Sequence, residues 1–150
     1  MVKIYKTTIQ KFEYLAKRIF IPAIIIFAVT GTVKAQNVNV TATVGTAAAT
    51  YNTLKKAFDE INAGTHQGVI TIDIAISTDE GTTPAVLNSN TADPASYTSI
   101  YIKPATTNIV VTGNPAAGFG VIELNGADNV TIDGSFNGTS SRDLTINNTG

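Results

Sequence analysis

Hydrophobic and polar residues alternate strictly along residues 37–44, where every second residue is Val or Ala. This period of two predicts a half-buried β-strand that ends at Gly45. The period changes between residues 50 and 64, where the large apolar residues recur at helical spacing: Tyr51, Leu54, Phe58 and Ile61. These residues share one face of a helix, so we expect a short amphipathic helix with Thr50 as its N-cap and Gly64 as its stop.

From residue 69 onward the helical period does not return. Short β-branched runs, each closed by Gly, Asn or Asp, predict further strands at 69–76, 98–103, 108–113, 121–126, 129–134 and 143–148. Units this short cannot bury their own apolar face, so they favour a parallel β-solenoid in which each unit stacks on the next. The alternative is a β-sandwich of antiparallel hairpins, because Asn-Gly and Asp-Gly also favour hairpin turns.

The first 35 residues differ in charge from the rest of the chain. They carry one acidic residue, Glu13, and these basic residues: Lys3, Lys6, Lys11, Lys17, Arg18 and Lys34. The apolar run 19–29 follows the basic stretch, and small residues stand at Val33 and Ala35. This order is typical of a secretory signal peptide cleaved after Ala35.

Two other interpretations of the same segment are weaker. A membrane anchor needs roughly 20 apolar residues to cross the bilayer, and the run 19–29 is shorter and contains Pro22. A buried core helix would need polar residues for a solvent face. We therefore expect a signal peptide at residues 1–35, no stable membrane span, and a protein that is secreted or held at the outer cell surface.

Composition excludes several classes of protein. Charged residues make up 14 % of the chain, against a typical share of about 25 %, and no basic cluster beyond the leader could neutralise the phosphates of a nucleic acid. The chain has no Cys and a single His, His66, which rules out disulfides, thiol catalysis and a multi-histidine metal site. After residue 35 there are four basic and ten acidic residues, a net charge of −6.

Two stretches resemble a known family. Residues 50–58, followed by residues 61–68, resemble the N-terminal cap of right-handed parallel β-helix proteins of the pectin-lyase-like class. Residues 121–134, with Asn125-Gly126 and Asp133-Gly134, resemble a recurring rung of large exported bacterial surface proteins. The resemblance implies an all-β fold: a right-handed parallel β-helix (solenoid) with a short N-terminal capping helix, preceded by the signal peptide.

The implied organisation has three parts. Residues 1–35 are the signal peptide, residues 36–68 the N-terminal strand and capping helix, and residues 69–150 the first rungs of the β-helix. Similar proteins are much longer and often carry a C-terminal sorting domain. Because an uncapped last rung exposes unpaired backbone groups after Asn148, we expect a truncated chain.

Candidate catalytic groups are sparse. His66 lies in a turn-rich link, and Asp73 and Ser77 show no nucleophile-elbow pattern, so we expect a solvent-exposed loop histidine. Four carboxylates could pair across stacked rungs as in glycosidases: Asp73, Glu123, Asp128 and Asp133. Family lyases use Lys or Arg near acids, but Lys103 and Arg142 lie in no recognisable motif. The family's catalytic residues do not carry over, and we predict no catalytic residue here.

Other polar residues favour structural roles. Residues 133–138 match the first half of a calcium loop, but Leu144 occupies the position of the bidentate Glu, so we expect a turn and no metal or cofactor. Tyr97 and Tyr101 could form an aromatic platform for sugar or cover core edges. Four asparagines recur near strand ends and could stack as an amide ladder: Asn125, Asn129, Asn147 and Asn148.

These patterns favour an exported structural or adhesin-like segment that contacts glycans or surface proteins and meets the export machinery through its signal peptide. The alternative is the N-terminal part of a polysaccharide lyase or glycoside hydrolase whose active site lies beyond residue 150. A third interpretation is a β-sandwich carbohydrate-binding module. None of the three involves nucleic acid.

Overall fold

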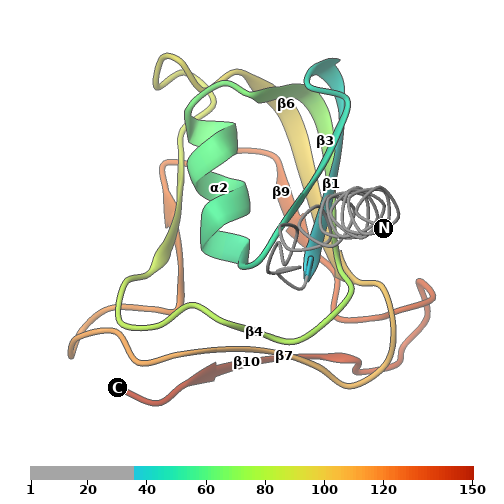
Figure 1. Ribbon diagram of the computed structural model, residues 1–150, viewed down its shortest axis with the longest axis vertical. Helices are drawn as coiled ribbons and strands as arrows, with labels where there is room; N and C mark the ends of the chain where they lie inside the picture. The colour runs from blue at the N-terminus through green and yellow to red at the C-terminus, as the bar shows by residue number, and fades with distance from the viewer. Residues whose placement is uncertain (1–35) are drawn as a thin grey trace, which may run out of the picture. The chain divides into compact units, whose positions relative to one another are not determined.

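A computed structural model describes residues 36–150, so the predicted signal peptide at 1–35 lies outside the described residues. The described part contains one helix and ten strands (Figure 1). In chain order they are β1 (Val38–Gly45), β2 (Ala48–Tyr51), α2 (Leu54–Asn62), β3 (His66–Ile74), β4 (Thr78–Asp79), β5 (Ala85–Asn88), β6 (Tyr97–Pro104), β7 (Ile109–Gly113), β8 (Ile122–Asn125), β9 (Val130–Ile132) and β10 (Leu144–Asn148).

The strands form three small sheets. The largest has the order β2-β1-β3-β6-β9, and the others have the orders β10-β7-β4 and β5-β8. Strand β1 pairs antiparallel with both β2 and β3, whereas β3, β6 and β9 pair in parallel. The pairs in the two smaller sheets are all parallel.

The predicted right-handed parallel β-helix is therefore wrong, because the main sheet is mixed and the strands do not form a regular solenoid. The physical reason begins at Gly45, whose φ of +76° allows the chain to reverse directly after β1. Only two residues separate β1 from β2, which is enough for an antiparallel hairpin and far too few for a parallel crossover. Strand lengths also vary, from two residues in β4 to nine in β3.

The core is built from alternate residues of the strands. In β3 and β6, Ile70 lies opposite Ile100 and Ile72 lies opposite Ile102, and all four side chains are buried. Each fully buried isoleucine contributes about 1.5–3 kcal/mol relative to an exposed one. Since one face of the main sheet is closed in this way, its other face carries the remaining positions, which are mostly polar.

Helix α2 lies beside the strands (Figure 1). The residues of its apolar face belong to this core. It begins later than the sequence predicts, because Thr50 and Tyr51 pair with β1 as part of β2. The N-cap is Thr53, whose Oγ1 accepts a hydrogen bond from the Lys56 N–H at 3.1 Å. The predicted stop is confirmed: Gly64, with φ +74°, follows the C-cap directly. Four residues form the buried face: Leu54, Ala57, Phe58 and Ile61.

Candidate binding face

The outward side of the β1–β3–β6–β9 sheet carries two rows of polar side chains, which we call the polar face. Strand register aligns each row across neighbouring strands. In β1, β3 and β6 the residue between the two rows is apolar and buried, whereas Ile132 of β9 is 39 % exposed. One row contains Asn39, Asp73, Lys103 and, directly after β9, Asp133; the other contains Thr41, Thr71, Tyr101 and Thr131.

Lys103 lies between two carboxylates in the first row. Its Nζ is 3.7 Å from Oδ1 of Asp73, a distance that permits an ionic attraction but is too long for a good hydrogen bond. The same Asp73 oxygen is buried and has no hydrogen-bond partner in this part of the protein. On the other side, Lys103 is aligned with Asp133, because Ile102 lies opposite Ile132 in the parallel β6–β9 pair. The row therefore alternates in sign: negative, positive, negative.

Asp133 is the best-connected group of the polar face. The hydroxyl of Tyr101 donates to its Oδ2, and Oδ1 accepts hydrogen bonds from the N–H and the hydroxyl of Ser135 at 2.8 and 2.7 Å. The Tyr101 hydrogen bond is the main reason that the pKa of Asp133 lies below its usual value, and the same bond raises the pKa of Tyr101. Asp133 is therefore held as a carboxylate.

This arrangement suits binding better than acid–base chemistry. A glycosidase needs a carboxyl group whose pKa is raised so that it can act as an acid, whereas hydrogen bonds lower the pKa of Asp133. What the polar face does offer is an ammonium, hydroxyls and carboxylates, on strands spaced about 4.8 Å apart.

The four predicted carboxylates do not meet at one site. Asp73 and Asp133 share a row, but Glu123 lies on β8 in another sheet, where its Oε1 accepts a hydrogen bond from the Gly120 N–H at 3.2 Å. Asp128 is an exposed residue just before β9. The fold therefore brings two of the four acids, Asp73 and Asp133, into one row, with Lys103 between them.

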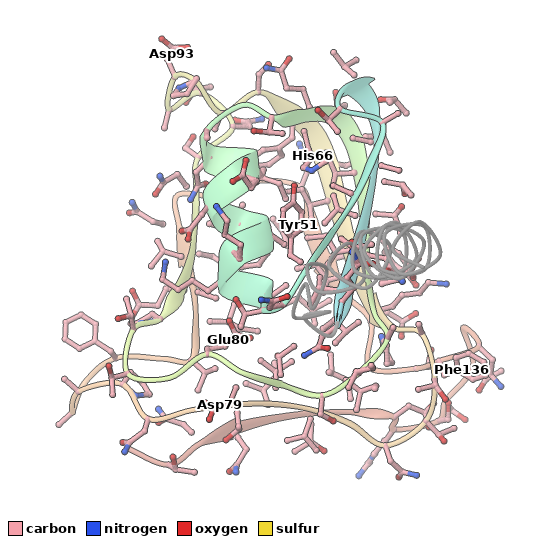
Figure 2. The ribbon with its side chains drawn as sticks, in the orientation of Figure 1. Tyr51, His66, Asp79, Glu80, Asp93 and Phe136 are labelled. Atoms are coloured by element: carbon pink, nitrogen blue, oxygen red, sulfur yellow. The ribbon has the colours of Figure 1, made fainter. Side chains whose placement is uncertain are left out.

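The expectation that His66 is an exposed loop residue is wrong. Its side chain is fully buried at the start of β3. Nδ1 lies 2.6 Å from the carbonyl oxygen of Thr46, so this nitrogen carries the proton and donates, and Nε2 lies 2.6 Å from the Tyr51 hydroxyl (Figure 2). His66 ties the β1–β2 turn and β2 to β3, and Asp73 lies at the opposite end of that strand.

The other candidates have structural partners. Ser77 Oγ accepts a hydrogen bond from the Val110 N–H at 2.9 Å, and the buried Tyr97 donates to the carbonyl of Asn88 at 2.7 Å. In the segment that resembles a calcium loop, Oδ1 of Asn137 is 2.6 Å from the Thr139 hydroxyl. No group of three or more His, Cys, Asp or Glu side chains within residues 36–150 is placed to hold a metal ion.

The predicted asparagine ladder is replaced by a different one. The Asn125 amide donates to Oδ1 of Asn88 at 3.0 Å, and the Asn88 N–H donates to Oδ1 of Asn62 at 3.0 Å. The side chains of Asn129 and Asn148 donate instead to backbone carbonyls elsewhere. The amide column therefore starts at the end of α2 and reaches β8.

The row of alternating charge corresponds to a repeat of 30 residues in the sequence. Asp73, Lys103 and Asp133 are spaced by 30 residues and each follows an isoleucine: Thr71-Ile72-Asp73, Tyr101-Ile102-Lys103 and Thr131-Ile132-Asp133. Glu80, a buried acid whose partners are backbone groups of α2, has no comparable signal.

No family model, curated protein or solved structure matches the chain. The resemblance to pectin-lyase-like proteins therefore stays a prediction from the sequence. Helix α2 has nine residues, and residues 36–150 contain no helix with the length and hydropathy of a membrane span.

Proposed function

We propose that this protein is exported to the cell surface or secreted, and that its polar face binds glycans. The observation that carries the proposal is the row in which Lys103 lies between Asp73 and Asp133, with Tyr101 beside it. Sugar hydroxyls both donate and accept hydrogen bonds, so a ligand rich in them matches a surface that presents both kinds of group.

The rigidity of the sheet supports this proposal. The residues that alternate with the polar face are Ile70, Ile72, Ile100 and Ile102, all buried at 0–1 % exposure. Because these side chains fix the strands, the outward groups are held in position before a ligand arrives, and little entropy is lost on binding. Tyr101 is also half-buried with its hydroxyl engaged, so its ring is a fixed apolar surface for a sugar.

Export is supported by the order of the first 35 residues. A basic stretch, the apolar run 19–29 and the small residues Val33 and Ala35 follow one another as in secretory leaders. Extracellular glycans are the ligands that an exported protein encounters, so the two halves of the proposal agree.

Binding of the full chain to an array of neutral and acidic oligosaccharides tests the proposal. We expect Lys103→Met to weaken the best interaction about tenfold, because hydrogen bonds to charged groups are worth about 1.5–3 kcal/mol. Tyr101→Phe should weaken it less. Lys56→Met is the matched control, since Lys56 also pairs with an acid but lies on the exposed side of α2.

Three results would contradict the proposal. The first is an array with no bound oligosaccharide, and the second is equal affinity for the wild type and the Lys103→Met variant. The third is cleavage of an oligosaccharide by the protein, which would favour a lyase or hydrolase.

A further inference from the structure

Three strands leave one edge unpaired at the same end of their sheets. Strand β9 is the last in the order β2-β1-β3-β6-β9, β10 is the outer strand beside β7, and β8 is the outer strand beside β5. Within residues 36–150 no further strand pairs with β8, β9 or β10 on that side. We call these three edges together the open edge, and each presents unpaired N–H and C=O groups.

Apolar side chains that continue the core are exposed at the open edge. Leu124 lies opposite Leu87, Ile132 opposite Ile102, and Ile146 opposite Val111. The inner member of each pair is fully buried, whereas Leu124, Ile132 and Ile146 are 48, 39 and 46 % exposed. In the earlier strands β3 and β5, which share their core with α2, the core-facing residues are buried.

The chemistry of this edge is that of a polypeptide partner. Another strand can pair with the unpaired backbone groups and cover the apolar residues at alternate positions. It can also extend the amide column, which ends at the exposed Asn125. A glycan has no alternating apolar side chains to cover Val130 and Ile132.

The charge of the neighbouring row indicates which strand would fit. In β3, Thr71-Ile72-Asp73 lies opposite Tyr101-Ile102-Lys103 of β6. Strand β9 and the residue after it repeat the β3 pattern as Thr131-Ile132-Asp133, and the outer side of β9 has no partner in the described residues. A row that runs Asp73, Lys103, Asp133 is continued by a cation.

The acidic surroundings point the same way. From residue 114 to residue 150 the chain carries four acids, Glu123, Asp128, Asp133 and Asp143, against a single cation, Arg142. Hydrogen bonds lower the pKa of both Asp133 and Asp143, so these two are ionised at neutral pH. A second copy would bring the same negative charge to the edge, which disfavours self-association through it.

We propose that the open edge binds an extended polypeptide segment that adds a strand beside β9. The segment has apolar residues at alternate positions, which cover Val130 and Ile132, and a Lys or Arg that faces Asp133. It resembles β6 in the pattern that β6 presents to β3. Asp133 belongs to both surfaces, but the backbone and apolar contacts of the segment use the edge and the inward side of the sheet, which the proposed glycan binding does not use.

A labelled synthetic peptide with the sequence of residues 97–104 is the probe, and fluorescence anisotropy with the full chain measures its binding. We expect saturable binding that weakens roughly tenfold when the Lys of the peptide is replaced by Glu. The chain variant Asp133→Lys should reverse this preference and bind the Glu peptide better. A peptide of the same composition without the alternation should not bind.

Two protein variants locate the binding. Ile132→Asp should abolish it, whereas Val69→Asp, a change at a similarly exposed residue within the sheet, should leave it unchanged. Equal binding of the Lys and Glu peptides, or equal loss in both variants, would overturn the proposal. So would concentration-dependent self-association of the chain that Ile132→Asp abolishes, because a second copy would then occupy the edge.

Discussion

Glu80 is buried beside the first turn of α2, and its carboxylate takes the place of part of a helix cap. Oε1 accepts a hydrogen bond from the Leu54 N–H at 3.1 Å, and Oε2 accepts one from the Lys55 N–H at 2.7 Å (Figure 2). Thr53 Oγ1 accepts from the Lys56 N–H. Together the two residues satisfy backbone donors that a helix start leaves free, and the negative charge lies at the positive end of the helix.

Replacing Glu80 should therefore destabilise the protein more than the loss of one exposed charge would. We expect Glu80→Ala to lower the free energy of unfolding by about 2–3 kcal/mol, because one buried and one partly buried N–H group lose their acceptor. Glu80→Gln keeps one acceptor and should cost about 1 kcal/mol. Urea unfolding measures both, with Asp79→Ala as the control. That neighbouring acid is exposed and accepts one exposed hydrogen bond, from the Gly81 N–H, so its loss should cost about 1 kcal/mol or less. Equal losses at Glu80 and Asp79 would contradict the capping role.

Asp133 and Asp143 give the fold an acid-sensitive component. Hydrogen bonds from Tyr101 to Asp133 and from Ser141 to Asp143 are the main causes that lower the two pKa values. A carboxylate with a depressed folded-state pKa stabilises the protein above its unfolded pKa, and this stabilisation is lost as the pH falls through the folded value.

We accordingly expect the urea midpoint to fall as the pH drops below about 4, where the unfolded chain begins to take up protons first. The double variant Asp133→Asn and Asp143→Asn should show a shallower dependence on pH. A matched Asp79→Asn variant should keep the slope of the wild type. A double variant with the wild-type slope would show that other acids dominate.

At the scale of elements, the β1–β3–β6 region contains a local irregularity around Gly68. The register shifts between Ala42 and Val44 on one side of β3, and between Gly68 and Val69 on the other. Gly68 has φ +74°, and a Cβ there would lie 2.4 Å from Oγ1 of Thr43, which accepts a hydrogen bond from the Val69 N–H. The bulge therefore depends on a glycine for both its conformation and its space.

The comparison of Gly68→Ala with Gly81→Ala separates these two requirements. Gly81 has a similar φ of +70° but nothing within 4 Å of its Cβ position. We expect about 1 kcal/mol of destabilisation at Gly81 from backbone strain alone, and at least about 2 kcal/mol at Gly68, where the clash is added. Thermal unfolding of the two variants measures the difference, and equal shifts in melting temperature would argue against the clash.

Sequence patterns predict some of these elements well and miss others for physical reasons. Alternation locates β1, β3 and β6, and helical spacing finds the buried face of α2. Strands β4 and β5, of two and four residues, are too short to show a period. Tyr51 fits the helical spacing but lies in β2, because pairing with β1 is a tertiary effect that spacing cannot show.

The polar face is harder to predict from the sequence than the strands are. The pairing of Asp73 with Lys103 depends on register, which the alternation of a single strand does not determine. The burial of His66 depends on Tyr51 and on the carbonyl of Thr46, both of which reach it only after the β1–β2 hairpin has formed. Residue types alone therefore indicated an exposed histidine.

For the whole molecule, removal of the leader is the first prediction to check. If residues 1–35 direct export, intact mass analysis of the protein recovered outside the cell should give a chain that begins at Gln36. Ala35→Arg should block cleavage and leave the longer chain, because the cleavage site requires small residues. Exported protein that begins at Met1 would contradict the signal peptide.

The pairing distances along the chain have a consequence for how the protein folds. In the parallel pairs, Ile70 meets Ile100 and Ala85 meets Ile122, segments 30 or more residues apart, whereas β1 and β2 are joined by a two-residue turn. Closing long loops is slow compared with forming a hairpin. The rate-limiting step should therefore be one of these parallel pairings, and a chain that emerges N-terminus first would present β6 with β3 already in place.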